Sequence, residues 1–113
     1  MSPIERELAT ILTQLGLEFS AHAILGPYEL DIVLKDYKLN IECDGELFHS
    51  SPDEADRQAR RDGWLRTQGF GVLHVRGKHI MNERDFVIRE IRRAIRTGPQ
   101  TALRRTEPVV KRK

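Results

Sequence analysis

Residues 28–44 read YELDIVLKDYKLNIECD, and this stretch decides how the rest of the chain is interpreted. Apolar residues at every second position predict a strand, with Leu30, Ile32 and Leu34 on one face. After the short polar link at residues 35–38, the alternation resumes and predicts a second strand. Because the link is so short, the two strands should form an antiparallel hairpin.

Acidic residues occupy both strands of this hairpin. If the link closes symmetrically, paired residue numbers sum to 73, which sets Asp31 opposite Glu42, and Asp44 then shares the face of Glu42. Like charges opposed across a ladder are destabilising, so three carboxylates on one face require a compensating cation. Oxygen ligands of this kind suit Mg²⁺ or Mn²⁺, which can activate water for phosphodiester hydrolysis. Spacing alone leaves open a solvated sheet face whose acids are in register by accident.

Periodicity and capping signals predict further elements around the hairpin. They are a helix over 3–15 that Ser2 caps, a strand over 17–25, a helix over 52–68, a strand over 70–76, and a last helix between an Asn82 cap and Gly98-Pro99. A strand, a helix and a strand of these lengths imply a right-handed crossover and a parallel pair. The expected fold is α/β: a helix, a three-stranded antiparallel meander, a crossover helix, a parallel fourth strand and a C-terminal helix.

The same periodicity predicts which side chains are buried. In the crossover helix, Asp62 falls on one stripe with Ala55, Ala59 and Leu65, so its charge should face inward and meet an arginine or the metal site. Trp64 and Phe86 are expected in the core. Alternation sets the Cys43 side chain with Leu39 and Ile41, away from the carboxylates, which favours core packing over a role as a thiol nucleophile.

Length and composition limit the alternatives. The 113 residues fit one domain over 1–96, followed by a flexible basic tail over 97–113 that holds five Lys or Arg and one acid. No apolar run is long enough to span a bilayer and no signal peptide is recognised, so a cytoplasmic protein is expected. A single cysteine excludes an internal disulfide and a zinc site built from several thiolates. Residues 1–96 carry a net charge of −2, which is only a weak argument against nucleic acid, since a cation would neutralise several of the acids.

Three sequence blocks resemble those of a known family. Tyr28-Glu29-Leu30-Asp31 followed by Ile41-Glu42-Cys43-Asp44-Gly45 is similar to the signature of the PD-(D/E)XK (restriction endonuclease-like) superfamily. Very-short-patch mismatch-repair endonucleases and related small (Vsr-like) nuclease domains are more similar still, over about residues 2–80. The blocks are Pro3-Ile4-Glu5-Arg6, Glu42-Cys43-Asp44-Gly45-Glu46-Leu47-Phe48-His49, and Arg60-Arg61-Asp62 followed by Gly69-Phe70-Gly71-Val72-Leu73.

The resemblance implies roles for individual residues. Asp31 would be the central ligand of Mg²⁺ or Mn²⁺, with Glu42, Asp44 and the Cys43 backbone carbonyl beside it. Asp44 stands where the superfamily usually has Lys and the repair enzymes have His. His49 would be the general base or proton shuttle, although a lone loop histidine is usually ordinary surface. Glu5 and Asp62 would be acidic residues that support the metal ligands or position water, although Glu5 is also where a capping-box acid belongs.

Contacts to nucleic acid follow from the same resemblance. Leu47 and Phe48 match an apolar pair that wedges into the base stack. Four arginines of the crossover helix are candidates for phosphate binding or for a merely solvated face: Arg57, Arg60, Arg61 and Arg66. Because Asp44 replaces the usual Lys of the superfamily, the negative charge of the transition state would be stabilised by the metal, by His49 or by an arginine such as Arg57 or Arg61. His22, His74 and His79 receive no role from the sequence.

The expected activity is a metal-dependent endonuclease that nicks DNA as a monomer, or cuts both strands as a homodimer. The structural zinc of the repair enzymes is not expected here, which puts specific recognition of a mismatch in question. Two alternatives stay open: an RNA-binding or RNA-cleaving module with a fold like that of RAP domains, and a non-catalytic accessory domain of a larger DNA-processing system.

Overall fold

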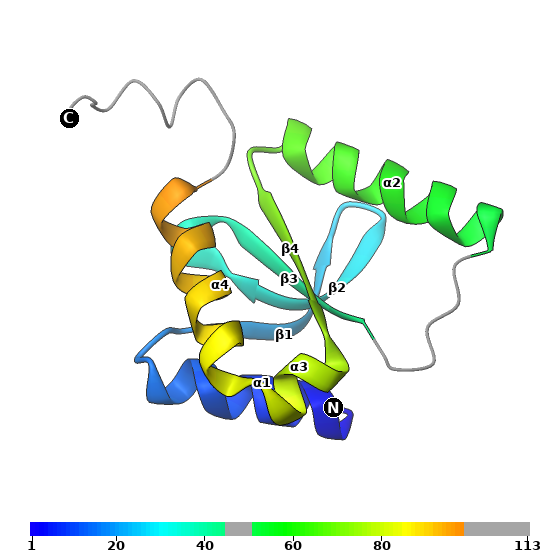
Figure 1. Ribbon diagram of the computed structural model, residues 1–113. Coiled ribbons are helices and arrows are strands. Elements are labelled where there is room, and N and C mark those ends of the chain that lie inside the picture. Colours follow the sequence, from blue (N-terminus) through cyan, green and yellow to red (C-terminus); the bar gives the residue numbers. More distant parts are fainter. Residues whose placement is uncertain (45–50, 99–113) are drawn as a thin grey trace.

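The computed structural model describes residues 1–44 and 51–98 (Figure 1). Its elements are α1 (Pro3–Gln14), β1 (Ser20–Leu25), β2 (Tyr28–Leu34), a 3-10 turn η1 (Lys35–Tyr37), β3 (Leu39–Asp44), α2 (Pro52–Thr67), β4 (Gly71–Arg76), α3 (Gly77–Asn82) and α4 (Arg84–Thr97). This order confirms the expected α/β succession, with one more helix than predicted. Residues 45–50 and 99–113, which include most of the expected basic tail, lie outside the described residues.

The four strands form one mixed sheet in the order β1-β2-β3-β4. β2 pairs with β3 in the predicted antiparallel register, from Ile32 opposite Ile41 to Leu34 opposite Leu39. β4 lies parallel to β3 and pairs with it along the whole strand, which confirms the crossover. Since β1 and β4 are the two edges, the acidic strand β3 lies inside the sheet.

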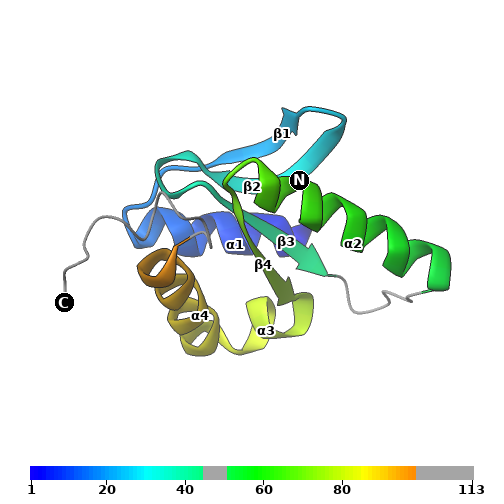
Figure 2. The ribbon, with the colours of Figure 1, turned by 90° about the horizontal axis from the view of Figure 1, so that it is seen from above.

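Helices cover both faces of the sheet. α1, α3 and α4 pack on one face, where Leu12, Ile41 and Ile91 belong to the main core cluster. α2 lies on the opposite face, which we call the α2 face, over a smaller cluster that contains Val33 and Leu65 (Figure 1). Seen from above, α3 lies at the end of β4 and α4 runs back from it (Figure 2).

Side-chain alternation in β2 is broken at Asp31. Ile32 and Leu34 enter the main core, but Leu30 packs on the α2 face with Val33, so the prediction that all three share a face is wrong. On the neighbouring strand, the position opposite Asp31 is His22, whose φ is 55°. Positive φ is uncommon for residues other than glycine, and this distortion in β1 coincides with the change of face in β2.

Several burial predictions also fail. Asp62 and Leu65 are buried as expected, but Ala55 and Ala59 are exposed, because only the C-terminal half of α2 buries side chains. Trp64 is half-buried and lies over Gly26, where a Cβ atom would come within 2.4 Å of the indole ring. Phe86 is 36% exposed and forms a T-shaped ring contact with His79 instead of entering the core.

The C-terminal helical region divides in two. Asn82 is the last residue of α3 and donates from its side chain to the Lys78 carbonyl, so it is not the predicted N-cap. α4 begins at Arg84 and Gly98 ends it as expected. Among the helices of residues 1–44 and 51–98, none is long and apolar enough to cross a membrane.

Candidate active site

Asp31 leaves the β2–β3 ladder and bonds to the backbone of β3. The ladder ends at the pair Ile32 and Ile41, so Asp31 is not the direct partner of Glu42 that symmetrical closure predicts. Its Oδ2 instead accepts a hydrogen bond of 3.0 Å from the Cys43 backbone N–H. This bond joins the first predicted metal ligand to the β3 segment that carries Glu42 and Asp44.

Glu42 is a buried carboxylate, with 5% of its surface exposed. Its Oε2 accepts a 2.9 Å hydrogen bond from the Asn40 amide, and its Oε1 lies 3.5 Å from Nη1 of Arg61. Burial raises the pKa of Glu42, and the negative charge of Asp31 acts in the same direction, although Asn40 and Arg61 oppose both. The ionised form of Glu42 is therefore less favourable in this site than in water.

Asp44 and Asp62 are bridged by His74. Nε2 of His74 donates to Oδ2 of Asp62 at 2.7 Å, and its Nδ1 lies 3.5 Å from Oδ2 of Asp44. The three residues come from β3, β4 and α2, so this bridge ties the crossover helix to the acidic end of the sheet. His74 is also opposite Glu42 in the parallel register.

Polar atoms without partners remain in this cluster. Within the described part of the chain, the buried atoms Asn40 Oδ1, Arg61 Nε, Arg61 Nη2 and Asp62 Oδ1 have no hydrogen-bond partner. Arg61 Nε lies 3.5 Å from Asp62 Oδ1, which is ion-pair distance without a hydrogen bond. Buried polar atoms are normally satisfied, so this cluster has unused capacity to bind water, a cation or substrate.

Cys43 lies beside the carboxylates without sharing their chemistry. Its side chain packs against the main core with Ile41, as alternation predicted. Burial, together with the surrounding acids, raises the pKa of the Cys43 thiol to about 12. The thiol therefore stays protonated at neutral pH, which argues against a nucleophilic role.

Glu5 is held by two sets of contacts. Ser2 and Glu5 form the predicted capping box, with Glu5 Oε1 accepting from the Ser2 backbone N–H at 2.9 Å. The same oxygen lies 3.4 Å from Nε2 of His22, whose Nδ1 donates to Glu29 at 2.8 Å. Glu5 thus caps α1 as predicted. Its predicted role in positioning water at the metal site stays a prediction.

The arginines predicted to bind phosphate differ in their contacts. Arg61 is engaged inside the cluster, and Arg57 forms an ion pair with Glu54 on its own helix. Arg60 and Arg66 are exposed. Leu47, Phe48 and His49 lie outside the described residues.

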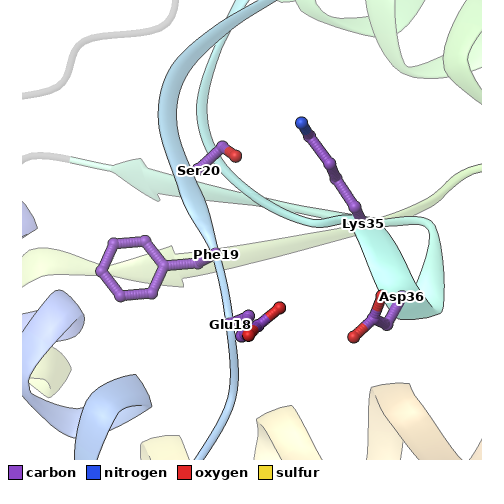
Figure 3. A pocket seen from close by; sticks show the side chains of 5 residues that line it. All are labelled: Glu18, Phe19, Ser20, Lys35 and Asp36. Carbon is purple, nitrogen blue, oxygen red and sulfur yellow. The ribbon is translucent and has the colours of Figure 1, made fainter.

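The structure brings Asp31 to the β3 segment that carries Glu42, and His74 bridges Asp44 and Asp62. These residues do not form a complete metal centre. In residues 1–44 and 51–98, no group of three His, Cys, Asp or Glu residues is positioned to hold a metal ion. A cavity of about 200 Å³ lies elsewhere, at the hairpin end of the sheet (Figure 3). Its lining residues are Glu18, Phe19, Ser20, Lys35 and Asp36, none of which is a predicted site residue.

Sequence reasoning missed three residues of this network: Asn40, His22 and His74. Asn40 could have been identified, because alternation sets it on the face of Glu42. His74 could have been found by extending the parallel register from β3 to β4. The role of His22 depends on its backbone distortion, which leaves no periodic signal.

A sequence model of the restriction-endonuclease-like family REase_MTES_1575 matches residues 4–95. An uncharacterized protein of Haemophilus influenzae is 34% identical over 77 residues, which cover 68% of this chain and 63% of that protein. The chain thus spans less than two thirds of that relative's length. The catalytic domain of the homing endonuclease I-Bth0305I matches with a TM-score of 0.69 at 22% identity, over 84% of this chain and 94% of that domain, which is a likeness of fold.

Proposed function

Because the chain belongs to the restriction-endonuclease-like family REase_MTES_1575, we propose that it is a metal-dependent endonuclease that hydrolyses phosphodiester bonds in DNA. The observation that carries this proposal is the buried carboxylate of Glu42, which lies on one strand with Asp44 and beside the Cys43 amide that binds Asp31. We further propose that the chain is related to the very-short-patch repair endonucleases, as the three sequence blocks imply, and that it lacks their structural zinc.

The chemistry of these residues fits a hard divalent cation. Burial and the charge of Asp31 both disfavour the ionised form of Glu42, so a bound cation would relieve a cost that the protein itself does not remove. Asp31, Glu42 and Asp44, with the Cys43 backbone carbonyl, would hold Mg²⁺ or Mn²⁺. When bound, such an ion supplies a water of lowered pKa and a Lewis acid for the phosphoryl oxygens.

The surrounding residues would hold this set in place and manage protons. The Cys43 amide orients Asp31, and His74 orients Asp44 and Asp62. Arg61 is close enough to Glu42 to limit charge repulsion before the cation enters. His49 would take the proton of the attacking water, and Glu5 and Asp62 would position water near it.

Two other functions remain as alternatives to this proposal. An RNA-cleaving or RNA-binding module would use the same backbone chemistry, and an accessory domain would bind without cutting. A monomer would nick one strand, whereas double-strand cleavage would require a homodimer.

The test is cleavage of supercoiled plasmid and of labelled RNA by the wild type and by Asp31→Asn, each with Mg²⁺, Mn²⁺ or EDTA. We expect metal-dependent conversion of plasmid to nicked circles by the wild type. In Asp31→Asn the rate should fall by about 10²-fold or more, because a metal ligand is lost.

Asp36→Asn is the matched control, since it removes an exposed carboxylate at the opposite end of β2. Its nicking rate should equal that of the wild type. Cleavage in EDTA, or equal rates for Asp31→Asn and wild type, would refute the metal mechanism. Cleavage of RNA alone would favour the first alternative, and binding without cleavage in every metal would favour the second.

A further inference from the structure

α4 is the most basic helix in the described part of the chain. It contains five arginines and two acids, whereas α2 contains four basic and four acidic residues. The crossover helix, which the sequence favoured for phosphate binding, is therefore neutral as a whole. Two of its arginines are also engaged in ion pairs with Glu54 and Glu42.

Four of the α4 arginines form one surface stripe. Arg89, Arg92, Arg93 and Arg96 follow helical spacing and are exposed, and we call them the α4 arginine stripe. The opposite side of the helix buries Val87 and Ile91 in the main core, so the stripe is fixed facing outward. Because this apolar side is already covered, α4 is unavailable to insert into a membrane surface.

Two arginines of the stripe, Arg89 and Arg92, hold uncompensated positive charge. Arg93 is 2.6 Å from Glu90, but neither Arg89 nor Arg92 has an acidic partner within ion-pair distance among residues 1–44 and 51–98. Arginine suits phosphate because its planar guanidinium can donate two parallel hydrogen bonds. From Arg89 to Arg96 the helix rises about 10 Å, which matches about three phosphates of one strand.

A cavity at the β4 edge lies next to the C-terminal end of α4. The C-terminal ends of α2 and α4 meet across the β4 edge at a cavity of about 200 Å³. Arg66 of α2 and Thr97 of α4 line it, together with Gly71 at the start of β4. Figure 1 shows both helix ends beside this part of the edge strand. The exposed Arg66 thus extends the basic surface around the edge, away from the carboxylates at the other end of β4.

We propose that the α4 arginine stripe, with Arg66, is a second nucleic-acid contact that binds the sugar-phosphate backbone outside the cleavage site. The inference rests on the proposed function and adds to it the surface that would hold the substrate. Such a surface contacts charge and not base edges, so it would raise affinity for DNA or RNA without selecting a sequence.

The test measures binding without cleavage. Fluorescence anisotropy with a labelled 20-base-pair DNA duplex and a labelled RNA of equal length would be recorded in EDTA over a KCl series. The test variant is R89Q/R92Q/R96Q. The matched control is R6Q/K35Q/K78Q, which removes the same charge from exposed positions on other elements.

We expect the slope of log K against log [KCl] for duplex DNA to fall by about 2 or more in the test variant, and affinity at low salt to fall about tenfold or more. The control should keep a slope close to that of the wild type. R89K/R92K/R96K preserves charge and should restore most of the slope, which separates electrostatics from misfolding.

Equal slopes for the test and control variants, or no binding by the wild type, would overturn the inference. A stripe-dependent slope in a protein that never cleaves would uphold the inference and refute the proposed activity. Metal-dependent nicking with equal slopes for the test and control variants would support the proposed activity and refute the inference about the stripe. The RNA and DNA arms show which backbone is bound more tightly.

Discussion

Nε2 of His74 lies 2.7 Å from Oδ2 of Asp62 and so joins an edge strand to the crossover helix beneath it. Asp62 is 9% exposed, and its other oxygen has no hydrogen-bond partner among the described residues. Removing the imidazole would therefore leave a buried carboxylate with little but Arg61 near it. This bond should contribute to stability as well as to the shape of the site.

We predict that His74→Ala lowers the free energy of unfolding by about 1–3 kcal/mol, the cost of an unsatisfied buried polar group. His74→Gln keeps an amide donor at a similar reach and should lose less. Urea unfolding at pH 7 in EDTA measures both. If the two variants unfold at the same urea concentration, the donor to Asp62 contributes nothing measurable.

The thiol of Cys43 gives a second prediction. Because burial raises its pKa to about 12, the native protein should resist alkylation by iodoacetamide at pH 8 and react only when unfolded. Cys43→Ala should keep metal-dependent cleavage close to the wild-type rate, at a cost in stability of about 1 kcal/mol from the lost core volume. A folded but inactive Cys43→Ala protein would mean that the thiol takes part in the reaction.

The sheet was predictable from sequence because its signals are local and repeat. Alternation over 28–44 predicted both strands and their register, and the Ser2 cap predicted the start of α1. The same alternation predicted that Glu42 and Asp44 share one strand and one face. These signals depend on neighbours close in the chain, which is where single-sequence reasoning is strongest.

Contacts between elements were harder to predict. Alternation failed at Asp31, at the level of the sheet where His22 on the neighbouring strand has a positive φ. Helical spacing sets the phase of α2 but not how much of it covers the sheet, so Ala55 and Ala59 are exposed. The His74 bridge requires the β4 register and the α2 position together, and neither follows from a pattern within one element.

His22 gives a prediction about pH. Its hydrogen bond with Glu29, followed by the charge of Glu5, raises the pKa of His22 above the ordinary value of 6.5. Stability from this pairing is then fully present below pH 6.5 and is lost as pH rises through the raised value. His22→Asn retains a residue that tolerates positive φ but removes the titrating ring.

The difference in unfolding free energy between wild type and His22→Asn should therefore shrink as the pH rises above 6.5 through the raised pKa of His22. NMR titration of the ring should show the raised pKa directly, and Glu29→Gln should lower it toward 6.5. A His22 pKa at or below 6.5 in the wild type would contradict the contacts described above.

Glu42 links the electrostatics of the site to the proposed cation. Since burial opposes its charge, Glu42→Gln in EDTA should change stability little, because the relief of a buried charge offsets the loss of a partner of Arg61. Adding Mg²⁺ or Mn²⁺ at ten times its dissociation constant should stabilise the wild type by about 1.4 kcal/mol and the variant by much less. Thermal unfolding at pH 7.5 with and without metal measures both effects, and Asp36→Asn should respond to metal as the wild type does. An equal gain for Glu42→Gln and wild type would mean that the cation binds elsewhere, because a ligand stabilises only through the residues that hold it in the folded state.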